Sequence, residues 1–367
     1  MQNPAPDPLR LGAGHSIRFR VGRHRRVSRK GHRLEALYRR SFTWEMRSTR
    51  SIALATLPAA AAIALWNGYR RVSKELGSHV AASPVIPGKV RSIPTSWGRL
   101  SYRIVPGTDP GPPLVLVHGW GRSADSVWWP LIANTDRTVI AIDLPGHGRS
   151  LLEQRFTFDL AADAVLAAVA DSGVIRPVLV GHSMGGPVAL TALRRSGESD
   201  FVGFVAIATS SYWVRPRHQI MVAAAPYAMA QGSPILMRAQ RAETRRAPDQ
   251  ASRIAWEYAV RPPRRILEEA AAELRRFDAR RWDDLSLPPA VWVITLDDGI
   301  IDPADQAASA QHLGIPTVSL PNDHPVVIQA PAALARIIEE ASSVWSLNRP
   351  IRIRRRMLRT NGSDQDS

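Results

Sequence analysis

A serine between glycines, at the junction of an apolar strand and an apolar helix, limits the fold of this chain more than any other feature. The predicted strand Pro177–Val180 ends at this junction, and the predicted helix Pro187–Arg195 begins there. The residues between them are Gly181-His182-Ser183-Met184-Gly185-Gly186. A turn this tight holds its serine at strained backbone angles, and the glycines beside it avoid clashes. Because the turn opens a helix, main-chain N–H groups there favour negative charge. We therefore predict that Ser183 is a nucleophile.

Short apolar runs alternate with helical patterns from residue 90 onwards. The runs predict buried parallel strands at residues 101–105, 114–117, 139–142, 177–180, 202–207 and 290–295. Helical patterns lie between them, notably Phe158–Asp171 and Pro187–Arg195. Strands that alternate with helices favour a mostly parallel sheet with helices on both faces. The pattern therefore predicts an α/β fold.

A second glycine-rich turn follows the predicted strand Leu114–Val117. It reads His118-Gly119-Trp120-Gly121. Acyl transfer needs two main-chain N–H groups that point at the tetrahedral oxyanion, and losing one such donor costs about 3 to 4 kcal/mol. We predict that Met184, directly after the serine, supplies one N–H group and that Trp120 supplies the other. The glycines let the backbone approach the substrate, whereas His118 is assigned a structural hydrogen-bonding role.

A third segment adds to this pattern. Residues 143–150, with the sequence Asp-Leu-Pro-Gly-His-Gly-Arg-Ser, follow the next predicted strand. The His-Gly-x-Gly, Asp-x-Pro-Gly-x-Gly-x-Ser and Gly-x-Ser-x-Gly motifs, in this order and at these separations, resemble those of the α/β-hydrolase superfamily. The resemblance covers residues 90–345 and implies an eight-stranded, mostly parallel twisted sheet with a helical cap insertion. The His-Gly-Trp-Gly stretch also resembles that of pimeloyl-ester esterases.

The resemblance implies a catalytic triad that runs Ser, then Asp or Glu, then His along the chain. Only His312 and His324 lie after the last plausible acid. His312 falls in the helical stretch Ala304–Leu313. His324 lies in a loop before the apolar helical pattern Val326–Ile338, which is where the family places its base. His324 is therefore the predicted base.

Three aspartates follow the predicted strand Ala290–Thr295, namely Asp297, Asp298 and Asp302. The family pattern is an aspartate one turn past this strand and a few residues before a proline. Asp298 fits that pattern best, and Asp297 is the alternative. Asp302 is predicted to cap the helix that begins near Pro303.

These residues predict a serine hydrolase that cleaves carboxylic esters of small molecules through an acyl-enzyme. No metal or organic cofactor is expected. Thioester, carbon–carbon or peptide hydrolysis and perhydrolase activity stay open, because the triad does not determine specificity. Dehalogenases and epoxide hydrolases of this fold carry aspartate in place of Ser183, which argues against both. The alternative from another class is a non-catalytic, membrane-tethered binding scaffold.

Residues 210–281 interrupt the alternation with several helical segments, many prolines and no clear strand. They predict a helical cap inserted into the core. The core then consists of residues 90–209 and 282–345. His182, Tyr212 and Trp213 are candidate residues of an apolar substrate pocket. The alternative is that the aromatic residues of the cap pack it onto the core.

The formal net charge of +16 is concentrated at the two ends of the chain. Residues 1–50 have a net charge of +10 and are predicted to be disordered, whereas residues 346–367 form a basic, then polar tail with a net charge of +4. The ends contain no recognised nucleic-acid-binding module, and aromatic residues are sparse among their arginines. Nucleic-acid binding is therefore not expected.

Residues 51–89 are predicted to form an apolar helix and a linker. The continuous apolar stretch 51–66, flanked by arginines, predicts a membrane anchor or an export signal, or else an Ala-rich helix packed on the core. The protein would be membrane-associated or exported in the first case and cytoplasmic in the second. The chain contains no cysteine, which excludes disulfides and thiolate metal sites but leaves the compartment open.

Overall fold

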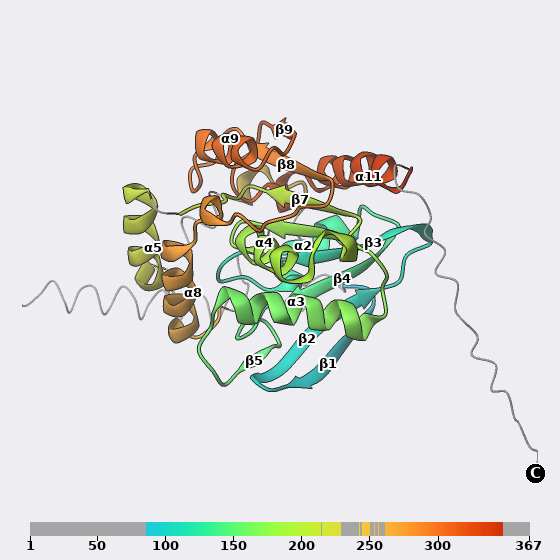
Figure 1. Ribbon diagram of the computed structural model, residues 1–367, viewed down its shortest axis with the longest axis horizontal. Coiled ribbons are helices and arrows are strands. Elements are labelled where there is room, and N and C mark those ends of the chain that lie inside the picture. The colour runs from blue at the N-terminus through green and yellow to red at the C-terminus, as the bar shows by residue number, and fades with distance from the viewer. Residues whose placement is uncertain are drawn as a thin grey trace, which may run out of the picture. The chain divides into compact units, whose positions relative to one another are not determined.

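The computed structural model describes residues 86–213, 215–228, 242, 244–249, 253, 256 and 261–347. Their strands form one nine-stranded sheet in the order β1-β2-β4-β3-β6-β7-β8-β9, with β5 paired to β2 beside this path (Figure 1). The strands are β1 (Lys89–Thr95), β2 (Gly98–Val105), β3 (Asp109–Val117), β4 (Arg137–Asp143), β5 (Leu151–Leu152), β6 (Val178–His182), β7 (Gly203–Ile207), β8 (Ala290–Thr295) and β9 (Thr317–Leu320). All neighbours from β4 to β9 are parallel, whereas β2 is antiparallel to β1, β4 and β5. The predicted mostly parallel α/β fold is confirmed, and the sheet has nine strands where eight were expected, because the two-residue strand β5 also pairs with β2.

Helices cover both faces of the sheet. One face carries α3 (Phe158–Ser172), α4 (Gly185–Ser196) and α9 (Pro303–His312), and the other carries α2 (Ala124–Ile132), α10 (Val326–Gln329) and α11 (Pro331–Leu347). A short 3-10 turn, η2 (Glu198–Asp200), follows α4. The central strands are buried on both faces: Leu114 and Leu116 of β3 pack in the layer of α2, while Val115 packs in the layer of α3. The apolar runs in the sequence therefore correspond to strands covered on both sides.

Local signals set several helix ends. The hydroxyl of Thr157 accepts a hydrogen bond from the N–H of Leu160 (3.1 Å) at the start of α3. Gly173, in the left-handed region at φ 73°, ends that helix. The carboxylate of Asp302 accepts a hydrogen bond from the N–H of Ala304 (2.8 Å), with Pro303 in the first turn of α9. The predicted cap at Asp302 is therefore confirmed.

The structure also corrects the sequence interpretation. The prediction that residues 101–105 form a parallel strand is wrong, because β2 is antiparallel to all its neighbours. The apolar runs do not predict the edge strands β1 and β9, because the side chains of these strands are largely exposed. The helix expected over Val326–Ile338 is divided into α10 and α11 at Pro331, which lacks an N–H group and restricts the residue before it.

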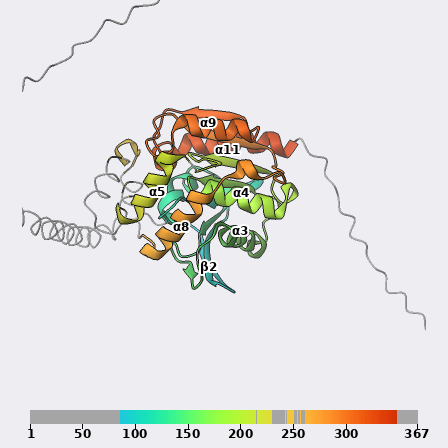
Figure 2. The same ribbon diagram turned by 60° about the vertical axis from the view of Figure 1, so that its left-hand side comes forward.

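The β7–β8 segment, residues 208–289, contains the region expected to form a cap. Its described parts include α5 (Pro216–Ala228), η3 (Thr244–Arg246), α8 (Arg264–Arg276) and η4 (Ala279–Arg281). Helices α5 and α8 pack against each other at one side of the sheet (Figure 2). The two ends of the segment are joined by main-chain hydrogen bonds, from Trp213 to Phe277 (3.0 Å) and from Ala279 to Ser211 (2.8 Å).

Within the ranges that the structure describes, no helix has both the length and the apolar character to cross a bilayer. The disorder expected at residues 1–50, the apolar helix expected at 51–66 and the tail from residue 348 onwards lie outside the described residues.

Candidate active site

Ser183 lies at the junction of β6 and α4, as the sequence predicts. Its φ of 55° is in the left-handed region, which is rare for a residue with a side chain. Three hydrogen bonds hold its backbone there. Its N–H donates to the carbonyl of Ile207 (3.0 Å), and its carbonyl accepts from the N–H of Gly186 (2.9 Å) and the hydroxyl of Thr209 (2.7 Å). The strain at this residue is therefore maintained by the surrounding structure.

Two glycines make this junction possible. A Cβ atom on Gly185 would lie 2.2 Å from the carbonyl oxygen of Val117, and one on Gly181 would lie 2.6 Å from the carbonyl oxygen of Gly185. Both contacts are with backbone atoms that cannot move aside. The close approach of α4 to β3 and β6 therefore requires residues without side chains at these positions.

The structure brings Ser183, His324 and Asp298 together in one line of hydrogen bonds. His324 Nε2 lies 2.9 Å from the Ser183 hydroxyl oxygen, and His324 Nδ1 lies 2.9 Å from Oδ2 of Asp298. All three side chains are buried. Because the Asp298 carboxylate is an acceptor, Nδ1 carries the proton and Nε2 is left to accept the hydrogen of the serine hydroxyl. This tautomer is the one that a general base needs.

Asp298 is held by donors on both of its oxygens. Oδ1 accepts from the N–H groups of Ile300 (2.8 Å) and Ile301 (2.9 Å), and Oδ2 accepts from the hydroxyl of Thr295 (2.8 Å) and the amide of Gln306 (2.9 Å). Burial alone would raise the pKa of Asp298, but the charge and hydrogen bond of His324 and the Ile301 and Thr295 donors outweigh it and lower that pKa. Asp298 is therefore ionised beside the imidazole at neutral pH.

The rival residues lie elsewhere. Asp297 forms an exposed ion pair with Arg246 (2.7 Å), Asp302 caps α9, and His312 is exposed in the last turn of that helix. Gln306 was not singled out in the sequence, because nothing local distinguishes it from other polar helix residues. It contacts Asp298 only because α9 packs beside the loop that follows β8.

Two main-chain N–H groups near the serine have no protein acceptor within the described residues, those of Met184 and Trp120. They belong to the two loops expected to form an oxyanion site. His118 stabilises the loop after β3, because its Nδ1–H donates to the carbonyl of Gly119 (2.8 Å). His118 Nε2 accepts from the N–H of Leu144 (3.1 Å). Burial, with the nearby His147, lowers the pKa of His118 well below its ordinary value, so this support stays neutral.

His182 is placed differently from the predicted pocket role. Its Nε2–H donates to the main-chain carbonyl of His324 (3.0 Å), and its Nδ1 is buried without a partner in the described part of the chain. Burial, together with the charge of His324, lowers the pKa of His182 to about 3. Its neutral ring therefore holds the backbone of the residue that contacts Ser183.

The other two candidate pocket residues are buried at the base of the β7–β8 segment. The hydroxyl of Tyr212 lies 3.4 Å from Asp305 and 3.1 Å from the guanidinium of Arg215. Trp213 is 3% exposed and joins the core layer of α3 and α4. These contacts attach the segment to the core, which was the alternative interpretation of its aromatic residues.

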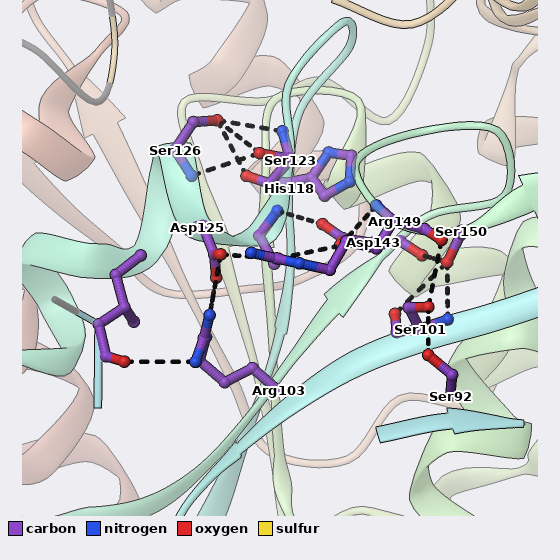
Figure 3. Close-up of polar contacts among 12 residues, drawn as sticks. Ser92, Ser101, Arg103, His118, Ser123, Asp125, Ser126, Asp143, Arg149 and Ser150 are labelled. Atoms are coloured by element: carbon purple, nitrogen blue, oxygen red, sulfur yellow. Dashed lines mark hydrogen bonds and ion pairs between the residues drawn. The ribbon is translucent and has the colours of Figure 1, made fainter. Parts of the chain in front are cut away.

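The loop after β4 forms a polar network with residues of β2 and the start of α2 (Figure 3). Asp143 accepts hydrogen bonds from the N–H groups of Ala124 (2.8 Å) and Arg149 (3.0 Å). Asp125 joins the guanidinium groups of Arg149 (2.7 Å) and Arg103 (2.8 Å). Burial is the main cause that raises the pKa of Asp143 to about 6. The network ties the start of α2 to the loop after β4. This loop includes Leu144, whose N–H donates to His118.

The described residues contain no group of three or more His, Asp or Glu side chains that could hold a metal ion.

Comparisons with known proteins place the chain in a family. Residues 114–337 match the model of the Alpha/beta hydrolase family. The dihydrolipoyllysine-residue acetyltransferase component of the acetoin cleaving system of Pseudomonas putida is 43% identical over 96 residues, 25% of this chain and 26% of the relative. The pimeloyl-[acyl-carrier protein] methyl ester esterase of Methylococcus capsulatus is 44% identical over 87 residues, 23% of this chain and 32% of the relative. The matched stretches thus span about a third or less of these relatives.

A thermophilic esterase from Thermogutta terrifontis has a similar structure, with a TM-score of 0.59 and 22% identity. The likeness covers 70% of this chain and 99% of the esterase chain. At this identity it is a likeness of fold.

Proposed function

Because this chain belongs to the alpha/beta hydrolase family, we propose that it is a serine hydrolase that cleaves carboxylic esters. The observation that carries the proposal is the line of two 2.9 Å hydrogen bonds from Ser183 through His324 to Asp298. A serine hydroxyl is a weak nucleophile on its own and becomes reactive beside an oriented base. The strained position of Ser183 at the opening of α4 adds to this argument.

In the proposed reaction, Nε2 of His324 removes the hydroxyl proton of Ser183 as the oxygen attacks the ester carbonyl carbon. The carbonyl oxygen becomes an oxyanion, which the main-chain N–H groups of Met184 and Trp120 stabilise. The bond to the alcohol then breaks, and His324 donates its proton to the departing alkoxide. Water, deprotonated by His324, hydrolyses the acyl-enzyme. The carboxylic acid leaves, and Ser183 recovers its proton.

The ester substrate is the finer part of the proposal. The relative from Methylococcus capsulatus is a methyl ester esterase by name, which favours an ester over a thioester or peptide. We place substrate selection in the β7–β8 segment, acting as a cap. Arg246 of this segment pairs with Asp297 (2.7 Å) and donates to the carbonyl of Pro321 (3.4 Å), so the segment reaches the loops that carry the acid and the base.

The test combines a covalent probe with a substrate series. We expect a fluorophosphonate to label the folded protein, and nitrophenyl esters of graded acyl length to be hydrolysed with one preferred length. Both properties should disappear in Ser183→Ala and persist in Ser172→Ala, a matched change at the end of α3. A folded wild-type protein that resists the probe and hydrolyses no member of the series would refute the proposal and favour a binding scaffold.

A further inference from the structure

The β7–β8 segment forms hydrogen bonds with the loop that follows β3. The indole Nε1–H of Trp120 donates to the main-chain carbonyl of Leu267 in α8 (3.2 Å). From the residues just before α8, Arg261 donates through Nη1 to the carbonyl of Gly121 (2.8 Å). Two consecutive residues of the loop thus each form a hydrogen bond with the segment, one as a donor and one as an acceptor.

Arg122, the next residue of the loop, makes the closest of these contacts. Its Nη1 donates to the main-chain carbonyl of Trp256 (2.6 Å), and its guanidinium carbon lies 3.5 Å from the centre of the Trp256 ring. Arg122 is 7% exposed and Trp256 is 3% exposed, so this stacked pair is shielded from water and salt. The Trp256 ring also lies edge-on to the ring of His182, at 6.5 Å between centroids. The segment therefore reaches both the loop and the residue before Ser183.

The loop itself has little intrinsic rigidity where precision is needed. Glycines flank Trp120 on both sides, and Gly121 has a φ of 67°. The Trp120 N–H belongs to the Gly119–Trp120 peptide, whose carbonyl accepts hydrogen bonds from His118 Nδ1 (2.8 Å) and from the Arg122 N–H (3.3 Å). The direction of the Trp120 N–H also depends on the position of the Trp120 Cα atom. The β7–β8 segment holds that end of the peptide through the Trp120 side chain and the Gly121 carbonyl. An oxyanion donor acts only when it points at the position of the developing charge, and a misplacement of about 1 Å can cost about 100-fold in rate.

We propose that the β7–β8 segment positions the oxyanion N–H group of Trp120, with the Trp120 side chain, Arg122 and Arg261 as positioning residues. This inference rests on the serine hydrolase proposed above. It assigns the segment a part in stabilising the transition state in addition to substrate selection. A purely structural role would attach the segment to the core without altering the geometry of the N–H group. The two roles predict different effects when a contact is lost. A positioning role weakens the binding of ligands that form an oxyanion and leaves the binding of other ligands unchanged.

Trp120→Phe isolates the contact, because it removes the indole N–H donor and keeps an aromatic ring and the main-chain N–H. We expect kcat for the best nitrophenyl ester to fall about tenfold, with KM unchanged within about twofold. The inhibition constant of a trifluoromethyl ketone of matching length should rise by the same factor, because its adduct with Ser183 carries an oxyanion. The corresponding methyl ketone should bind unchanged. Trp282→Phe, which alters a tryptophan stacked on Arg194 at the far end of the segment, is the matched control.

Arg261→Lys provides a second variant at an independent contact, since lysine keeps the charge but loses the planar guanidinium. It should lower kcat and raise the inhibition constant of the trifluoromethyl ketone, as Trp120→Phe does. Equal changes in KM and in the inhibition constants of both ketones would overturn the positioning role, and so would a loss of stability with unchanged kcat. Neither result would contradict the proposed esterase activity. A wild-type protein without esterase activity would overturn the proposed function and this inference together.

Discussion

The side chain at position 298 offers the sharpest test of the site, because its surroundings dictate how an amide would sit there. In Asp298→Asn, the amide NH2 cannot occupy the place of Oδ1, where two main-chain N–H groups, those of Ile300 and Ile301, point at it. The donors at Oδ2 include the Thr295 hydroxyl and the Gln306 amide, which belong to side chains that can adjust, whereas the two main-chain N–H groups at Oδ1 are fixed. We therefore expect the amide oxygen to take the place of Oδ1. The NH2 group then faces His324 Nδ1, which lies 2.9 Å from Oδ2 in the native protein. Because an NH2 group donates, Nδ1 becomes an acceptor and the imidazole proton moves to Nε2.

The consequence is a base in the wrong tautomer. Nε2, 2.9 Å from the Ser183 oxygen, would carry a hydrogen and could not remove the serine proton. The same exchange in the Ser-His-Asp template lowers kcat about 10⁴-fold, which corresponds to about 5.5 kcal/mol in the activation barrier. We expect a loss of that order in kcat/KM for the preferred nitrophenyl ester. Urea unfolding of the variant checks that the fold persists.

Asp297→Asn is the matched control, because it makes the same chemical change one residue away. Asp297 is paired on the surface with Arg246, so its loss should change kcat/KM by less than about threefold. If Asp297→Asn proved the more damaging of the two, or if Asp298→Asn kept a tenth of the activity, the assignment of the acid from these contacts would be wrong.

Two further predictions follow from buried groups near the site. Burial raises the pKa of Asp143 from 3.8 to about 6, so the folded protein holds this proton more tightly than the unfolded chain. The stabilisation by the protonated carboxyl, about 3 kcal/mol, is present below about pH 4 and is lost as pH rises through 6. Between pH 4 and 7, the free energy of unfolding in urea should therefore fall more steeply for the wild type than for Asp143→Asn. Parallel pH profiles of the two proteins would contradict this. His182→Phe removes the donor to the His324 carbonyl, and we expect kcat to fall about tenfold at constant KM, whereas an unchanged kcat would assign His182 to packing alone.

How far the sequence predicts this molecule depends on whether a signal is local. The turn around Ser183 was recognisable because its strand, its glycines and its helix are adjacent in the chain. The choice between Asp297 and Asp298 was not decided locally, because neighbouring residues of a loop differ in direction only through contacts such as those of Ile300 and Ile301. The strands β1 and β9 were missed for a related reason, since an exposed edge strand needs no apolar run.

What the sequence conceals most completely is the use of main-chain carbonyls as anchors for the site. His118 donates to the carbonyl of Gly119, His182 to that of His324 and Arg261 to that of Gly121. In each pair the donor is a side chain and the acceptor is a main-chain carbonyl, so the identity of the acceptor residue gives no sign of the contact. A substitution at the Leu267 side chain should therefore preserve the bond from Trp120 as long as α8 keeps its course, whereas removal of a donor cannot be compensated by the acceptor. Tolerance to mutation at the Trp120–Leu267 contact is thus expected to be asymmetric. Trp120→Phe should lower kcat and Leu267→Met should leave it unchanged, and equal losses in the two variants would contradict this.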